Sequence, residues 1–181
     1  MKIFVGCSSS RDIDNKYLID CKELLNELMK DNDLVFGACP YGLMGLSHDI
    51  TKSLNGKVIG ITPIAYKSDL DLLDCDLELL TKSVSERTDK LIELSDAIVF
   101  LPGGIGTIYE LFSVIESKRC NEFDKAVVIY NVNGYFDKLF EFMDKIYNEK
   151  FSKEKDKDNY FISTSINDII NYINNYKKEN V

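Results

Sequence analysis

The chain has 181 residues, a length typical of one domain with a sizeable core, and we expect a single domain over residues 1–181. Its 22 Lys and Arg against 30 Asp and Glu give a formal net charge of -8, so the mean field repels phosphates and no nucleic-acid partner is expected. No apolar segment approaches the length of a membrane span, so we expect no membrane partner either.

The cysteines and the single histidine match no zinc pattern. There are five cysteines, an odd number, and no two of them form a C-x-x-C pair. We therefore expect reduced and mostly buried thiols, no metal, and a cytoplasmic location, where reduced thiols persist. The cysteines are Cys7, Cys21, Cys39, Cys75 and Cys120, and the histidine is His48.

Six short apolar runs, each rich in Val, Ile or Phe and bounded by turn formers or charge, predict β-strands. In chain order they are KIFVG (2–6), LVFG (34–37), KVIGIT (57–62), AIVFL (97–101), AVVIY (126–130) and YFIST (160–164). Between most of them, apolar side chains recur with helical spacing, which predicts amphipathic helices. The three clearest stripes are Tyr17, Cys21, Leu24 and Leu28; Ile108, Leu111, Phe112 and Ile115; and Leu139, Phe142, Met143 and Ile146.

Nearly all-apolar strands that alternate with amphipathic helices are typical of an α/β fold with a doubly wound, Rossmann-like parallel sheet flanked by helices. In that architecture ligands bind beyond the carboxyl ends of the strands. Two polar segments are expected to be solvated, a loop at residues 152–160 and a fraying tail at residues 174–181.

The stretch FLPGGIGTIYE, residues 100–110, places three glycines between a predicted strand and a predicted helix. A helix start leaves backbone N–H groups unpaired, and missing Cβ atoms let an anion approach them. Gly103, Gly104 and Gly106 are therefore candidates for phosphate binding, with the hydroxyl of Thr107 as a further donor. The stretch lacks the lysine of a P-loop and the spacing of the G-x-G-x-x-G dinucleotide motif. The alternative is a tight turn without a ligand.

Two charged residues near these glycines are candidates for catalysis. Glu110 falls one turn into the helix, where a carboxylate beside a phosphate needs a separate task; the alternative is a simple interaction with the helix dipole, worth about 0.3–1 kcal/mol. Arg87 lies on the preceding predicted helix, whose Val84, Leu91 and Leu94 are expected to pack inward. The alternative for Arg87 is a surface position.

A second glycine-lined strand end occurs in VFGACPYGLMGLSHDI, residues 35–50. Here a predicted strand ends at Gly37, and Gly42 and Gly45 flank the start of the next helix, which makes both of them candidates for ligand binding. Two glycine-lined strand ends in one α/β domain are more than the formation of turns alone usually requires.

Over roughly its first 150 residues the chain resembles the LOG (Lonely Guy) family of cytokinin riboside 5'-monophosphate phosphoribohydrolases, which are often mislabelled as lysine decarboxylases. The family motif P-G-G-x-G-T-x-x-E is matched in full from Pro102 to Glu110. The family also carries an arginine fifteen residues before that proline, which is the position of Arg87. The segment VGCSSS looks like the family's Cys-Gly-Ser-Ser strand end, which makes Ser8 and Ser9 candidate ligands of the nucleotide.

Other positions depart from the family pattern. The GLMG segment at 42–45 is intact, but GACP at 37–40 replaces the usual run of glycines and serine before it, which stiffens and enlarges that loop. Val84, Ser85 and Thr88 replace the family's Met, His and Lys, and the loss of the lysine removes one positive charge near the expected phosphate. These departures bear on the identity of the substrate rather than on the reaction type.

The resemblance implies hydrolysis of the N-glycosidic bond of a nucleoside 5'-monophosphate, AMP or an N6-modified AMP, to free base and ribose 5-phosphate. It implies no metal or organic cofactor, and it implies a homodimer. Glu110 would stabilise oxocarbenium character on the ribose or position water, and Arg87 would orient Glu110 and keep it ionised by lowering its pKa. His48 is a candidate for protonating the leaving base, although a lone histidine is more often structural or exposed.

Two other classes of function stay open. One is a non-catalytic nucleotide or molybdenum-cofactor binding protein of related fold, which would have no use for a carboxylate beside a phosphate. The other is a scaffold for a partner protein, whose melting temperature would not rise with nucleotide. A decarboxylase activity has no support, because the expected reaction needs no lysine for pyridoxal phosphate.

Overall fold

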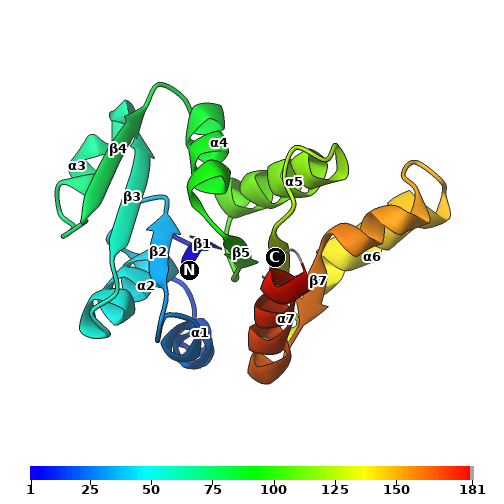
Figure 1. Ribbon diagram of the computed structural model, residues 1–181, viewed down its shortest axis with the longest axis horizontal. Coiled ribbons are helices and arrows are strands. Elements are labelled where there is room, and N and C mark those ends of the chain that lie inside the picture. Colours follow the sequence, from blue (N-terminus) through cyan, green and yellow to red (C-terminus); the bar gives the residue numbers. More distant parts are fainter. Residues whose placement is uncertain (180–181) are drawn as a thin grey trace.

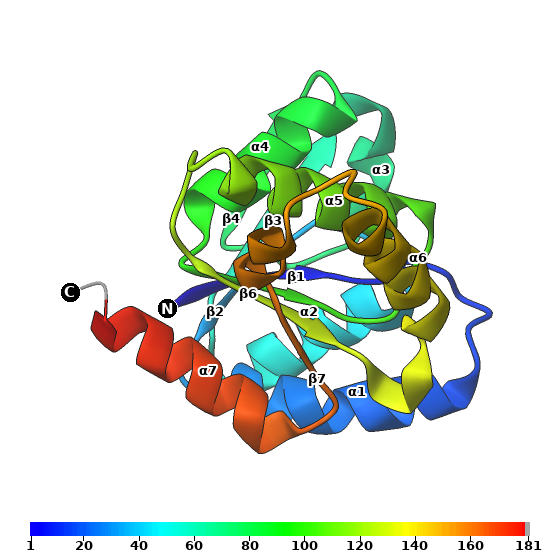
Figure 2. The ribbon, with the colours of Figure 1, turned by 90° about the vertical axis from the view of Figure 1, so that its right-hand side faces the viewer.

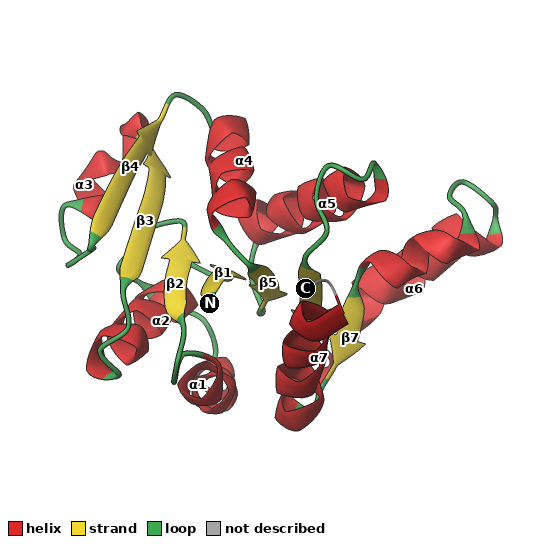
Figure 3. Ribbon diagram, in the orientation of Figure 1, coloured by secondary structure: helices red, strands yellow, loops and turns green. Residues whose placement is uncertain are grey.

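The computed structural model describes residues 1–179, with the backbone alone for residues 177–179. Its strands are β1 (Lys2–Gly6), β2 (Asp33–Phe36), β3 (Val58–Pro63), β4 (Leu77–Thr81), β5 (Ala97–Phe100), β6 (Ala126–Tyr130) and β7 (Phe161–Ser163). They form one parallel sheet in the order β4-β3-β2-β1-β5-β6-β7 (Figures 1 and 3). The predicted Rossmann-like α/β fold is confirmed.

Helices alternate with these strands along the chain. The α-helices are α1 (Asn15–Leu28), α2 (Gly42–Ser53), α3 (Lys67–Leu70), α4 (Val84–Leu94), α5 (Ile105–Arg119), α6 (Asp137–Asn148) and α7 (Ile166–Glu179). Three 3-10 turns are η1 (Ile64–Tyr66), η2 (Val132–Gly134) and η3 (Glu154–Asn159). Within residues 1–179, no helix is long and apolar enough to cross a membrane.

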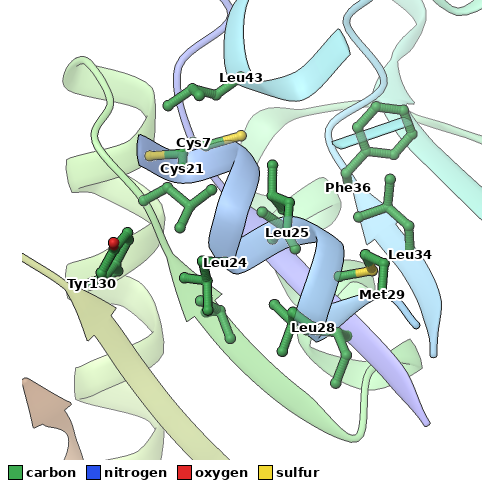
Figure 4. Packing of buried hydrophobic residues seen from close by; sticks show 14 of the residues in the cluster. Cys7, Cys21, Leu24, Leu25, Leu28, Met29, Leu34, Phe36, Leu43 and Tyr130 are labelled. Atoms are coloured by element: carbon green, nitrogen blue, oxygen red, sulfur yellow. The ribbon is translucent and has the colours of Figure 1, made fainter. Parts of the chain in front are cut away.

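The sheet is covered on both faces. α1, α2 and α7 pack on one face, and α4, α5 and α6 pack on the other (Figure 2). Neighbouring strand residues point to opposite faces, so Val5 of β1 lies in the first core and Phe4 in the second. Figure 4 shows α1 laying Leu24 and Leu28 against the strands. Burial of both faces explains why the central strands are almost entirely apolar.

All six predicted strands are present, with ends that differ by at most one residue from the apolar runs. The sequence did not predict β4. This strand lies at the edge of the sheet, where Leu77 and Leu80 are exposed and only Thr81 is buried. An edge strand with one solvated side does not need the continuous apolar run by which the other strands were identified.

Two side chains that were expected to face the core are exposed. Phe142 of α6 is 58% exposed, because Met143 and Tyr147 occupy the inner face of that helix. Val84 is exposed because it is the first residue of α4, whereas Leu91 of the same helix is fully buried. The helical spacing predicted both helices correctly but not the width of their buried stripes.

The two polar segments are more ordered than expected. Residues 152–160 contain η3, in which Asp156 is buried and accepts a hydrogen bond from the backbone N–H of Lys153. The segment predicted as a fraying tail, 174–181, is helical up to Glu179, and its last two residues lie outside the described residues.

The direction of winding changes between β1 and β5. β2, β3 and β4 follow on one side of β1, and β5 pairs with its other side. The loops that follow β1 and β5 meet at this point, where the backbone N–H of Ser8 donates to the carbonyl of Pro102 over 3.0 Å. A ligand crevice is expected at such a switch in a doubly wound sheet.

Gly42 offers a test of how tightly these loops pack. Its φ is 61°, and a Cβ there would lie 2.5 Å from the carbonyl oxygen of Ser10 and 2.8 Å from that of Ser8. We expect Gly42→Ala to lower the free energy of unfolding by about 1–3 kcal/mol, measured by urea denaturation. Gly104→Ala is the matched control, because no described heavy atom lies within 4 Å of its Cβ position. Equal losses in the two variants would contradict this account.

Candidate active site

The turn between β5 and α5 contains Gly103, Gly104 and Gly106, whose surroundings differ. A Cβ at Gly103 would lie 2.1 Å from the hydroxyl oxygen of Thr107, which is buried, so glycine is needed for the first turn to close. At Gly104 and Gly106, no heavy atom of residues 1–179 lies within 4 Å of a Cβ position. No described side chain caps the helix start at Gly104. The first N–H groups of α5 are therefore available to an anion.

The two candidate serines in the loop after β1 differ in burial and in their hydrogen bonds. Ser8 is buried, its carbonyl accepts from the N–H of Met44 over 3.1 Å, and its Oγ accepts from the N–H of Ser10 over 3.1 Å. Together with its bond to Pro102, these contacts tie the β1 loop to the β5 loop and to α2. Ser9 is exposed. Ser8 therefore borders the glycine turn, and contact of either serine with a nucleotide stays a prediction.

The loop after β2 contains the GACP departure and two candidate glycines. Ala38 has a φ of 54°, a left-handed conformation that costs an L-residue about 1–2 kcal/mol and that glycine would adopt more easily. A Cβ at Gly45 would lie 2.3 Å from the carbonyl oxygen of Pro40. Gly42 packs equally closely on the β1 loop. Loop packing thus explains both glycines, and their contact with a substrate stays a prediction.

Arg87 of α4 and Glu110 of α5 form an ion pair over the carboxyl ends of the central strands. Nη2 of Arg87 lies 2.5 Å from Oε1 of Glu110, and the side chains are 13% and 1% exposed. A Cβ at Gly6 would lie 3.5 Å from Oε2 of Glu110, and one at Gly37 would lie 3.8 Å from Nη1 of Arg87. Nε of Arg87 has no hydrogen-bond partner in the described part of the chain. The fold therefore joins the two predicted charges and leaves one buried donor of Arg87 without a partner among the described residues.

The pKa of Glu110 differs from the sequence-based expectation. Removal of the carboxylate from water raises its pKa from 4.5 to about 7, although the charge and hydrogen bond of Arg87 act in the opposite direction. Arg87 does lower the pKa of Glu110 as expected, but the cost of burial exceeds this effect, so the net pKa is raised rather than held low.

The position of His48 favours the structural alternative. Its ring is buried and stacks on Phe36, with 6.3 Å between ring centroids. Nδ1 lies 2.9 Å from Oδ1 of Asp49, and Nε2 lies 3.4 Å from the carbonyl oxygen of Asp74. Both ring nitrogens therefore have partners, and the contact of Nε2 holds α2 against the connection before β4, so neither nitrogen is left to protonate a leaving base.

Sequence reasoning missed a cavity beside the glycine turn. The cavity has a volume of about 290 Å³ and is bordered by Gly103 and Gly104, by Ile13 before α1, and by the rings of Tyr17 and Tyr135. The helical stripe had assigned Tyr17 to the core, and no pattern had singled out Tyr135. These two tyrosines are far apart in the sequence, so only the fold reveals their contact.

A larger cavity, of about 860 Å³, lies between the end of α5 and the connection from α6 to η3. Its charged lining includes Glu116 and Arg119, which pair with each other over 2.5 Å, and Asp156, which caps η3. None of the residues singled out from the sequence as site residues borders it. Its size therefore does not make it the candidate site.

Comparison with known proteins gives the same family as the motif at Pro102 to Glu110. A family model described as "Possible lysine decarboxylase" matches residues 44–173. The cytokinin riboside 5'-monophosphate phosphoribohydrolase LOG3 of Arabidopsis thaliana is 35% identical over 152 residues, which cover 83% of this chain and 71% of the relative. The chain belongs to the LOG family. Within this family, the probable phosphoribohydrolase LOG6 of the same plant is 36% identical over 153 residues and covers 82% of this chain and 75% of its own length.

Solved structures of other proteins share the fold of this LOG family chain at low sequence identity. The molybdenum cofactor carrier protein of Chlamydomonas reinhardtii superposes with a TM-score of 0.71 at 20% identity, over 98% of each chain. The molybdenum cofactor binding protein of Rippkaea orientalis has a TM-score of 0.68 at 17% identity, over 96% of this chain and 94% of its own. At such low identity the likeness establishes a shared fold, whereas membership of the LOG family rests on the sequence relatives.

The raised pKa of Glu110 predicts a pH dependence of stability. Because the folded-state pKa is about 7 and the ordinary value is 4.5, this contribution is fully present below about pH 4.5 and is lost as pH rises through 7. Between about pH 4 and pH 8, the wild type should lose about 3 kcal/mol of unfolding free energy relative to Glu110→Gln. Urea unfolding of both proteins at each pH measures this difference. A difference that does not vary with pH would refute the assignment.

Proposed function

We propose that the chain is a phosphoribohydrolase that cleaves the N-glycosidic bond of a nucleoside 5'-monophosphate, giving free base and ribose 5-phosphate. AMP or an N6-modified AMP of the cytokinin type is the proposed substrate. The observation that carries the proposal is the buried ion pair of Arg87 and Glu110 at the same strand ends as an open glycine turn. Membership of the LOG family supports the same reaction.

The 5'-phosphate is assigned to the start of α5. Gly104 and Gly106 leave space there, and the uncapped N–H groups and the positive end of the helix dipole favour an anion. This contact is remote from the bond that breaks. Its binding energy can therefore hold the ribose in place over the strand ends, where orientation lowers the barrier.

We assign Glu110 the role of acting on the anomeric carbon, C1', of the ribose. As the C1'–N bond breaks, its electron pair leaves with the base, and the positive charge that builds on the ribose is stabilised by the carboxylate. Water then adds to C1', Glu110 accepts a proton from it, and the released base takes up a proton. A pKa of about 7 suits a group that begins ionised and accepts a proton during the reaction.

Arg87 is assigned to positioning. Its Nη2 fixes one carboxylate oxygen of Glu110, while Oε2 faces the end of β1 at Gly6. The unpaired Nε is buried, a costly state for a guanidinium N–H, and we assign a ribose hydroxyl or a phosphate oxygen of the substrate as the partner that relieves it. The same side chain can therefore orient the carboxylate and contact the substrate.

The alternative is a non-catalytic nucleotide or molybdenum-cofactor carrier. One observation favours it, the likeness of the fold to the carrier proteins. It gives no reason for a carboxylate that is 1% exposed at the carboxyl ends of the central strands. We therefore prefer the enzyme.

Incubation of the protein with AMP and with N6-isopentenyl-AMP, followed by chromatography of base and ribose 5-phosphate, tests the reaction. We expect Glu110→Gln to lower kcat by at least about 100-fold while nucleotide affinity stays within a few-fold. Asp89→Asn, which removes an exposed carboxyl group from α4, is the control and should keep full activity. Tight nucleotide binding without base release by the wild type would favour the carrier instead.

We further propose a cytoplasmic homodimer. The five cysteines are free thiols, which suits a reducing compartment. The first turns of α5 also carry apolar residues on the outer face, with Ile105 88% exposed and Tyr109 exposed beside the glycine turn. Exposed apolar side chains next to a site favour a partner surface there, and a second copy would close the crevice over the substrate.

Light scattering after gel filtration tests the assembly. The wild type should have twice the chain mass of 20.7 kDa, and Ile105→Asp should shift it toward the monomer because a charge replaces a buried apolar contact. Phe151→Asp changes an equally exposed apolar residue on the connection after α6 and should leave the dimer intact. A monomeric wild type at micromolar concentration would rule out the proposed assembly.

A further inference from the structure

The outer edge of β4 is open. β4 ends the sheet order, so it pairs with β3 on one side and with no described strand on the other. Such an edge presents a row of unpaired backbone N–H and C=O groups, which another strand can join. Figure 1 shows β4 at the end of the molecule opposite α6. In the sheet, β3, β2 and β1 separate this edge from β5 and from the glycine turn that follows β5.

β4 lacks the features that usually protect an open edge. Edge strands of soluble proteins are often very short, or they carry Lys or Pro. The opposite edge follows this pattern, because β7 has only three residues, Phe161–Ser163. β4 has five residues, Leu77–Thr81, with neither Lys nor Pro, and Leu77 and Leu80 are each 44% exposed. The connection before the strand adds one more exposed leucine, Leu72. An exposed apolar edge of this kind favours a partner surface.

Two charged residues indicate which partner fits this edge. Glu78 lies within β4, and Lys82 directly follows the strand. Both residues are exposed, and neither forms an ion pair with any residue whose side chain the structure describes. The strand therefore carries one free charge of each sign, two positions on either side of Leu80. A second copy of the same strand, running antiparallel, carries the complementary arrangement.

The register of such a pair decides which side chains face each other. Backbone groups alternate between the two edges of a strand, so two copies pair antiparallel about a residue rather than about a peptide bond. A pair centred on Leu80 places Glu78 of each copy opposite Lys82 of the other, and Leu80 opposite Leu80. A pair centred on Leu79 would leave Glu78 opposite a leucine, and one centred on Glu78 would place two carboxylates together. Opposite charges at facing positions stabilise a strand pair, whereas like charges destabilise it.

We propose that β4 pairs with β4 of a second copy of this chain, antiparallel and centred on Leu80, so that two sheets join edge to edge. This contact uses the same surface on both copies and therefore closes, whereas pairing of β4 with β7 of another copy would continue into a filament. It is separate from the contact through α5. A short contact with exposed ion pairs belongs to the weak class of interfaces, so association is expected at roughly 100 µM.

The experiment measures mass by sedimentation equilibrium in an Ile105→Asp background, so that the α5 contact does not contribute. The background should have a mass near the chain mass of 20.7 kDa at about 5 µM and should approach twice that mass at about 500 µM. Adding Glu78→Lys or Lys82→Glu should keep the chain monomeric at both concentrations, because like charges then face each other twice. Lys22→Glu, a charge reversal at an exposed position of α1, is the matched control and should associate as the background does.

A mixture of the two charge variants tests the register and guards against a folding defect. When Glu78→Lys meets Lys82→Glu, each facing position again holds one positive and one negative side chain, so an equal mixture should recover the association of the background. The proposal is overturned if the background stays monomeric at about 500 µM, if either single variant associates as well as the background, or if the mixture does not recover. The charge variants distinguish this contact from the one through α5, because only edge pairing responds to them. Since the readout is mass, a chain that never releases base would defeat the proposed reaction and leave this test valid.

Discussion

The burial of a carboxylate against a guanidinium, over the ends of the central strands, is the constraint on which the site depends. Desolvation of Glu110 outweighs the attraction of Arg87, so the pair is not explained by stability. A hydrophobic pair of the same volume would usually serve the fold at least as well. The pair is better explained by chemistry, because it keeps a titrating group in a dry, oriented position. It also joins α4 to α5 above β1 and β2.

The glycines around this pair serve two physical purposes. Gly42, Gly45 and Gly103 lie where a Cβ would collide with neighbouring atoms, so they allow three loops to approach one another. Gly104 and Gly106 face open space, where a side chain would obstruct a ligand rather than the fold. One sequence motif therefore contains both a packing position and two open positions, and residue type alone does not separate them. The separation matters because only substitutions of the second kind can change ligand affinity without unfolding the loops.

The site combines two regions on either side of the switch between β1 and β5. The Arg87–Glu110 pair lies among elements of one face of the sheet, and Tyr17 comes from α1 on the other. The glycine turn lies between them and is the region that favours an anion. The formal net charge of -8 does not prevent this, because unpaired N–H groups at a helix start act locally.

The sequence by itself determined six of the seven strands, most of the helices between them, the family and the choice of Arg87 and Glu110 as partners. These follow from local periodicity and from a motif whose spacing is set by one strand, one turn and one helix. Only the tertiary structure decided that β4 completes the sheet, that the pKa of Glu110 is raised, that His48 has both nitrogens paired, and that Tyr17 meets Tyr135. The physical reason is common to all four. Desolvation, edge exposure and contacts between distant segments depend on what the fold places around a residue, and local sequence does not encode those surroundings.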